Sequence, residues 1–227
     1  MFSAGRARLL LAGGASVLAA TFALAVALPA SSGAATTSND STSFSVTAGS
    51  LAFSTAPAMP TLSAITLNGQ AQTTNTTMTS FAVDDATGSG SGWNVTVNGN
   101  SGTGKSAVFK EYCPNATCGT DSGPGYVSGG LTLPADSLTL NSTGASFTGQ
   151  NGTTGTAPTL QCSTACNVDS ASAVKIVSAA TSAGMGTWAS SGWSGTSLAL
   201  STPSSLKTLQ TGEVYRVDLV WTLNSGP

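Results

Sequence analysis

Apolar and polar residues alternate one by one in short stretches along most of the chain, and this period of two constrains the fold more than any other feature. Successive side chains of a β-strand point to opposite faces, so each such stretch would present one apolar and one polar face. The clearest stretch places five apolar residues on one face: Tyr215, Val217, Leu219, Trp221 and Leu223. Shorter stretches of the same kind occur at 43–47, 80–83, 93–98, 131–140, 174–176 and 198–200.

Turn-forming residues separate these stretches, and no segment beyond residue 36 shows a sustained helical period. Many short strands joined by Gly and Pro turns predict an all-β fold, either an antiparallel β-sandwich or a barrel-like single domain. Within 131–140, the turn Pro134-Ala135-Asp136 predicts a hairpin. Two Gly-, Ser- and Thr-rich stretches, 88–92 and 144–155, are expected to be loops.

The first 35 residues have the three parts of a secretory signal peptide. Arg6 and Arg8 precede the apolar run Leu9–Leu28, and small residues follow from Pro29 to Ala35. We therefore expect a signal peptide at 1–35, a flexible lead-in at 36–43 and one β-domain at 44–227. An uncleaved membrane anchor is the alternative, because the run reaches the roughly 20 residues that span a bilayer. No other stretch is apolar enough to span, and no hydrophobic tail for a sorting anchor precedes Pro227.

The composition excludes several functional classes. The chain has no histidine, which removes Ser-His-Asp and Cys-His catalysis and the commonest transition-metal ligand. Without Arg6 and Arg8, five basic residues remain against nine acidic ones, a net charge of −4 that disfavours nucleic-acid binding. Only 7% of residues are charged, yet 40% are hydrophobic, which is enough for a folded core. We expect no enzymatic activity, no cofactor and no metal.

Four cysteines lie in two close pairs, and export would place them in an oxidising compartment. The simplest of the three possible connectivities joins Cys113 to Cys118 and Cys162 to Cys166. The alternative, a four-cysteine zinc site, has the wrong spacing.

The four tryptophans are the candidate ligand- or partner-binding residues. Trp93 and Trp221 lie on the apolar faces of their predicted strands, which favours packing in the core. Trp188 and Trp193 lie among Gly, Ser and Thr, which indicates an exposed loop, and both contact with a ligand or partner and plain packing stay open for them. If Trp193 is a binding residue on such a loop, Trp193→Ala is expected to leave the melting temperature nearly unchanged. Aromatic rings stack on the C–H faces of sugars, and a mostly uncharged surface could bind a neutral polysaccharide through hydroxyl hydrogen bonds.

Two segments carry Trp-x-aliphatic motifs: Trp93-Asn94-Val95, and Trp221-Thr222-Leu223 close to Pro227. With Phe81-Ala82-Val83-Asp84-Asp85 before the first motif and Ala183-Gly184-Met185-Gly186 later, this arrangement resembles the WxL-domain surface proteins of Gram-positive bacteria. The resemblance covers about 44–227. The first motif departs from the pattern, because Val95 stands where the family has Leu.

The resemblance implies an exported protein of the cell surface that attaches non-covalently to peptidoglycan or another wall glycan. It also implies co-operation with other surface proteins. The lack of a second apolar stretch predicts no membrane span in the mature chain. The alternative is a structural or adhesive subunit whose ligand is another surface protein. A terminal strand at a sheet edge could add to such a partner's sheet.

Overall fold

A computed structural model describes Ser38 and residues 40–227. Residues 46–227 form one compact unit, and residues up to 45 belong to another. The predicted signal peptide, and part of the lead-in, lie outside the described residues. Among the residues that the structure describes, none forms a helix of the length and apolarity that crossing a membrane requires.

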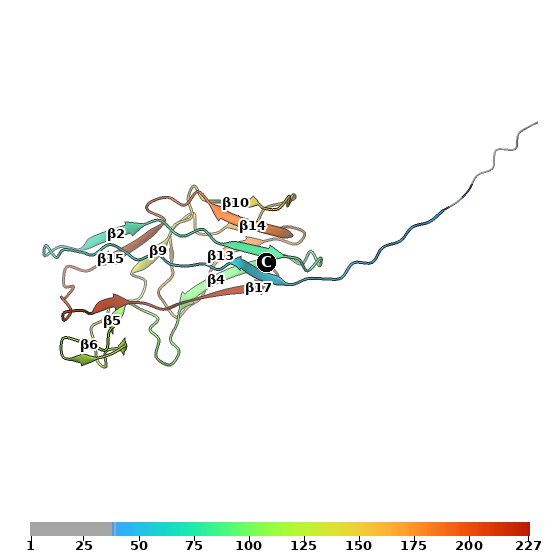
Figure 1. Cartoon of the computed structure of the whole chain (residues 1–227). Coiled ribbons are helices and arrows are strands. Elements are labelled where there is room, and N and C mark those ends of the chain that lie inside the picture. The colour runs from blue at the N-terminus through green and yellow to red at the C-terminus, as the bar shows by residue number, and fades with distance from the viewer. Residues whose placement is uncertain (1–37, 39) are drawn as a thin grey trace, which may run out of the picture. The chain divides into compact units, whose positions relative to one another are not determined.

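The all-β prediction is confirmed: every regular element of the described chain is a strand (Figure 1). The strands are β1 (Leu51–Thr55), β2 (Gln72–Thr76), β3 (Ala82–Asp85), β4 (Trp93–Gly99), β5 (Lys110–Cys113), β6 (Thr117–Cys118), β7 (Asp121–Ser122), β8 (Gly125–Tyr126), β9 (Leu138–Leu140), β10 (Ser146–Gly149), β11 (Thr159–Leu160), β12 (Cys166–Asn167), β13 (Val174–Ala179), β14 (Gly186–Ser191), β15 (Leu198–Thr202), β16 (Val214–Arg216) and β17 (Leu219–Ser225). All their pairings are antiparallel.

One layer of the fold consists of two sheets joined end to end. Their strand orders are β1-β3-β14-β10 and β2-β15-β9-β12. Along the chain β2 leads into β3, β9 into β10 and β14 into β15, so three long strands each bend between the two sheets. Backbone hydrogen bonds bridge the bend: Ser190 N donates to Phe81 O, and Asn141 N donates to Ser197 O, both at 2.8 Å.

The second layer is built in the same way from the sheets β11-β13-β4-β17 and β16-β5-β8. The predicted single strand at 215–223 divides at Val217–Asp218 into β16 and β17. Here Asp218 N donates to Ser106 O, and Asp218 O accepts from Asn100 N. The loop after β4 thus forms hydrogen bonds with the backbone N–H and C=O groups of Asp218, which an unbroken strand would use to pair with its neighbour. The prediction of one continuous strand is therefore wrong.

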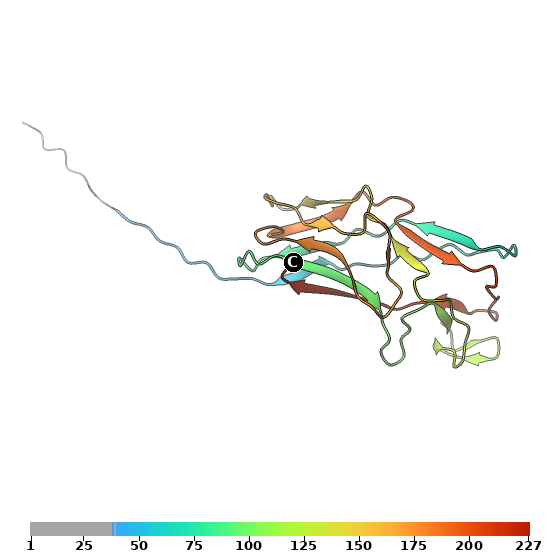
Figure 2. The same ribbon diagram turned by 180° about the vertical axis from the view of Figure 1, so that it is seen from behind.

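The two layers pack face to face as a sandwich, with the core between them (Figures 1 and 2). The central strand β4 buries Trp93, Val95 and Val97 completely. Rings bridge the layers: Phe147 of β10 lies 6.4 Å from Trp93, and Phe81, just before β3, lies 6.2 Å from Trp221 of β17. The inward positions are those that the alternation predicted for 93–98.

The predicted hairpin at 131–140 does not form. Leu138–Leu140 is β9, but it pairs with β12 and β15. The segment 131–133 instead bonds to the region of β5, where Leu133 N donates to Phe109 O and Glu111 N donates to Leu131 O. The turn residues 134–136 separate Leu131 and Leu133 from Leu138 and Leu140 by only a few positions. Segments more distant in the sequence nevertheless supply the hydrogen-bond partners of both leucine pairs.

Two other local predictions are also wrong. Residues 43–47 form no strand, and Phe44 and Val46 are 90% and 80% exposed. Within the expected loop at 144–155, residues 146–149 form β10, which pairs with β14. Small polar residues are poor strand formers alone, but a neighbouring strand supplies the pairing that stabilises them.

Candidate functional site

The two Trp-x-aliphatic motifs lie side by side in neighbouring antiparallel strands. In the pairing of β4 with β17, Val95 lies opposite Leu223 and Val97 lies opposite Trp221. Directly opposed residues of an antiparallel pair share a face of the sheet, so both motifs point into the sandwich. Val95, the position that departs from the family pattern, therefore packs beside the aliphatic residue of the second motif.

Three of the four tryptophans are core residues. Trp93 is fully buried, and its Nε1 donates to Gly184 O at 3.0 Å. Trp188 is 5% exposed and Trp193 9%, so the expectation that they lie on an exposed loop is wrong. Trp188 stands within β14, and its Nε1 donates to Met185 O at 3.0 Å; Trp193 Nε1 donates to Ser190 Oγ at 3.1 Å. Buried indoles with satisfied N–H groups pack well.

Trp221 is half-buried in β17, an edge strand of its sheet. Contact between any of the four rings and a ligand stays a prediction.

A groove opens along one edge of the sandwich, between β10 and β11. It has a volume of about 680 Å³. The edge strands of two different sheets border it, and these strands are not paired with each other. Six residues that line it carry hydroxyl groups: Ser142, Thr143, Ser146, Thr156, Thr159 and Ser163. Five others supply carbon surface: Ala145, Phe147, Ala157, Pro158 and Leu160.

The predicted disulfides are confirmed, and one of them supports this groove. Cys113 is bonded to Cys118 and Cys162 to Cys166. Cys162 O accepts a hydrogen bond from Ser142 N at 2.8 Å, and Ser163 O accepts one from Thr143 Oγ1 at 3.0 Å. The disulfide loop is thereby tied to the bend before β10, which fixes one end of the groove.

Sequence reasoning singled out none of the groove residues. The sequence feature that could have pointed to them is the segment 142–163, which is rich in hydroxyl-bearing residues and contains the expected loop 144–155. The groove exists only because the pairing of β10 with β14 and of β11 with β13 brings two sheet edges together.

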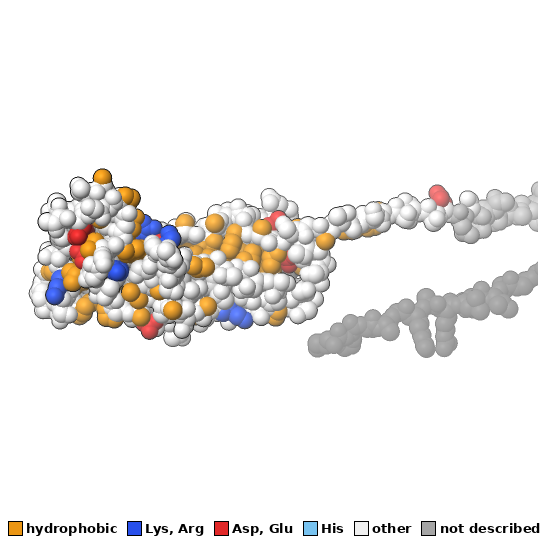
Figure 3. Space-filling view, turned by 90° about the horizontal axis from the view of Figure 1, so that it is seen from below, with side chains coloured by type: hydrophobic (Ala, Val, Ile, Leu, Met, Phe, Trp, Pro, Cys, Tyr) orange, Lys and Arg blue, Asp and Glu red, His pale blue; other side chains and the backbone are white. Residues whose placement is uncertain are grey.

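Charged side chains gather mainly at one end of the folded unit, on the face that Figure 3 shows. The strands β5 and β16 contribute Lys110, Glu111 and Arg216 to this end. A smaller hollow of about 280 Å³ also lies there, with Lys207 and Tyr215 among its lining residues. The β10–β11 groove, by contrast, has no charged residue in its lining.

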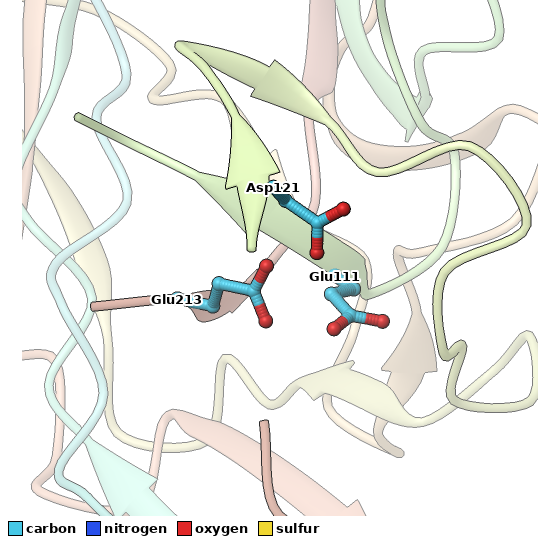
Figure 4. Close-up of side chains that lie close together, drawn as sticks. All are labelled: Glu111, Asp121 and Glu213. Atoms are coloured by element: carbon cyan, nitrogen blue, oxygen red, sulfur yellow. The ribbon is translucent and has the colours of Figure 1, made fainter. Parts of the chain in front are cut away.

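Three carboxylates form a cluster that the sequence did not reveal (Figure 4). Glu111 of β5, Asp121 of β7 and Glu213 before β16 each bring one oxygen within 4.8 Å of the others. Leu131 N donates to Glu111 Oε2 at 2.7 Å, and Gln210 donates to both other acids. Oε1 of Glu213 is closed off from solvent and has no hydrogen-bond donor among the described residues.

Burial, followed by contact with Glu111, raises the pKa of Glu213. Carboxylate oxygens are ligands for hard cations such as Ca²⁺, but Ca²⁺ takes six to eight oxygens and the cluster supplies three. We therefore assign the cluster no metal.

A second polar cluster sits at the bend between β16 and β17. Asp218 accepts from the Tyr126 hydroxyl at 2.6 Å and from the Arg216 guanidinium at 2.8 Å, with Lys105 at 3.8 Å. Burial alone would raise the pKa of Asp218, but the hydrogen bonds from Tyr126 and Arg216 lower it overall. The cluster fixes the bend and presents no reactive pair.

Comparison with known families gives one result. A family model described as "WxL domain surface cell wall-binding" matches residues 31–227, which include the whole compact unit 46–227. No curated protein and no solved structure shows significant similarity to the chain.

Proposed function

We propose that this chain, which belongs to the WxL domain family of cell wall-binding surface proteins, is exported and attaches non-covalently to the peptidoglycan of the bacterial wall. The observation that carries the proposal is the extent of the family match. It covers the folded unit from end to end, which supports wall binding as a property of this domain.

The chemistry of the fold supports binding more than catalysis. Catalytic groups usually have strongly perturbed surroundings and converge in a cleft. The groove between β10 and β11 has no charged residue in its lining, which offers hydroxyl groups and carbon surface. The acids of the carboxylate cluster are held by Leu131 and Gln210 instead of facing that groove. We infer a binding protein with no enzymatic role.

The test is co-sedimentation of the mature protein with purified peptidoglycan sacculi from which proteins and covalently bound polymers have been stripped. We expect the protein to pellet with the sacculi. Because the groove is uncharged, raising the salt concentration from about 0.15 to 0.5 M should leave retention unchanged. Incubation should release no soluble muropeptides, and their release would contradict a purely binding role.

One observation favours a second candidate, a structural or adhesive subunit that binds another surface protein. Among the strands of the described residues, β17 pairs only with β4, and it forms the edge of its sheet. An edge strand can accept a strand from a partner. Retention on untreated walls that disappears after proteins are stripped from them would favour this candidate over direct attachment to peptidoglycan.

A further inference from the structure

We propose that the groove between β10 and β11 is the wall-binding site, and that its occupant is the neutral amino-sugar glycan strand of peptidoglycan and not the stem peptides. This inference rests on the proposed function and adds to it the site and the part of the polymer that the site takes.

The hydroxyl groups around the groove are available to a ligand. Ser146, Thr156, Thr159 and Ser163 are exposed, and within the described residues none of their hydroxyls makes a hydrogen bond to protein. A hydroxyl both donates and accepts, so it can pair with the hydroxyl and acetamido groups of an amino sugar. Four such groups along one groove match a ligand with repeated polar groups along its length.

The carbon surface of the groove suits the other half of a sugar ring. Leu160 is half-buried and offers carbon surface to a ligand, whereas Phe147 is 8% exposed and forms the base of the lining, with two rings behind it. Its centroid is 5.7 Å from that of Phe81 and 6.4 Å from that of Trp93, both in edge-on geometry. Trp93, the tryptophan of the first motif, therefore supports the base of the groove from within the core and acts as a positioning residue.

The groove is also preorganised. The Cys162–Cys166 disulfide and the bonds from Ser142 and Thr143 hold one end. Gly144 adopts a φ of +85° in the adjoining turn, a conformation that favours glycine. A site that is formed before binding loses less conformational entropy when the ligand arrives.

Charge decides between the two parts of peptidoglycan. Stem peptides carry carboxylates, and binding them calls for Arg or Lys. The lining has neither, and the chain without its first 35 residues has a net charge of −4. Burying a carboxylate without a partner is costly, so the groove selects the uncharged glycan backbone.

The test introduces a charge into the groove without disturbing the core. Thr159→Glu changes an exposed residue of β11, and Thr73→Glu makes the same change at an exposed residue of β2, on an edge strand of another sheet. Both variants should keep the wild-type melting temperature. Retention of Thr159→Glu on stripped sacculi should fall at least about tenfold, since an unpaired charge in the groove opposes binding, while Thr73→Glu binds like the wild type.

Competition identifies the ligand. Neutral β-1,4-linked N-acetylglucosamine oligomers, which have the sugar backbone of the glycan strand without free carboxylates, should displace the wild-type protein from sacculi, and free stem peptides should not. The inference is overturned if Thr159→Glu is retained like the wild type or if only stem peptides compete. Failure of the wild-type protein to bind sacculi would instead overturn the proposed function itself.

Discussion

Truncation of Trp193 distinguishes packing from exposure at the position where sequence and structure disagree most. The indole is 9% exposed, lies 6.5 Å from the Phe81 ring and donates to Ser190 Oγ at 3.1 Å. Ser190 Oγ keeps a second partner, Phe81 N at 3.0 Å, so loss of the indole leaves no orphaned acceptor. The cost of Trp193→Ala is then set by the lost packing, about 3–5 kcal/mol for a buried aromatic ring.

For a domain of this size each kcal/mol lowers the melting temperature by about 2–4 °C, so the expected fall is about 6–20 °C. Thermal unfolding followed by circular dichroism, with both disulfides intact, measures it. Trp193→Phe is the graded control, because it keeps one six-membered ring and loses the rest of the indole with its N–H donor, so it should lower the melting temperature less than Trp193→Ala does. Half-buried Trp221 should lose less on truncation to Ala. A melting temperature for Trp193→Ala within about 2 °C of the wild type would refute the burial argument.

Three further predictions concern pH and export. Burial and contact with Glu111 raise the pKa of Glu213 above its ordinary 4.5. The contribution of Glu213 to the stability of the fold is therefore complete below pH 4.5 and is lost as the pH rises through the raised pKa. Glu213→Gln should flatten the resulting decline in melting temperature. Despite burial, hydrogen bonds lower the pKa of Asp218 below 3.8. The contribution of Asp218 to the stability of the fold is therefore present above pH 3.8 and is lost as the pH falls further. Asp218→Asn should remove this loss of melting temperature at acidic pH, and an unchanged dependence of melting temperature on pH would contradict the assignment. Mass spectrometry of protein from the wall fraction should find an N-terminus within 31–36, and an intact Met1 on membrane-bound protein would contradict export with cleavage.

The local pattern determined which residues face the core wherever a strand stands between two others. Trp93, Val95 and Val97 alternate with polar residues, and each is fully buried. The same holds for Leu198 and Leu200 of β15. The disulfides were predictable for a related reason, because cysteines four and five residues apart are neighbours in almost any turn.

Strand pairing is what the tertiary structure alone decided. The leucines of 131–133 and β9 have the pattern of a hairpin, yet both segments bond to distant strands. Trp188 has small, polar neighbours in sequence, but β14 lies between β3 and β10, so its ring is covered. An alternation with a period of two specifies which face of a strand each side chain occupies, but it does not specify which strand pairs with it. The partner strand depends on contacts between residues far apart in the chain.

The two clusters of functional interest depend on pairing in the same way. Glu111 and Glu213 meet because β5 pairs with β16, about a hundred residues later in the chain. The groove exists because two sheets end side by side, with Thr159 on one edge and Ser146 on the other. The sequence by itself determined an all-β, disulfide-bonded chain with Trp-x-aliphatic motifs and predicted its export. The tertiary structure decided where that chain has a groove, because the groove is made of side chains that only long-range pairing brings together.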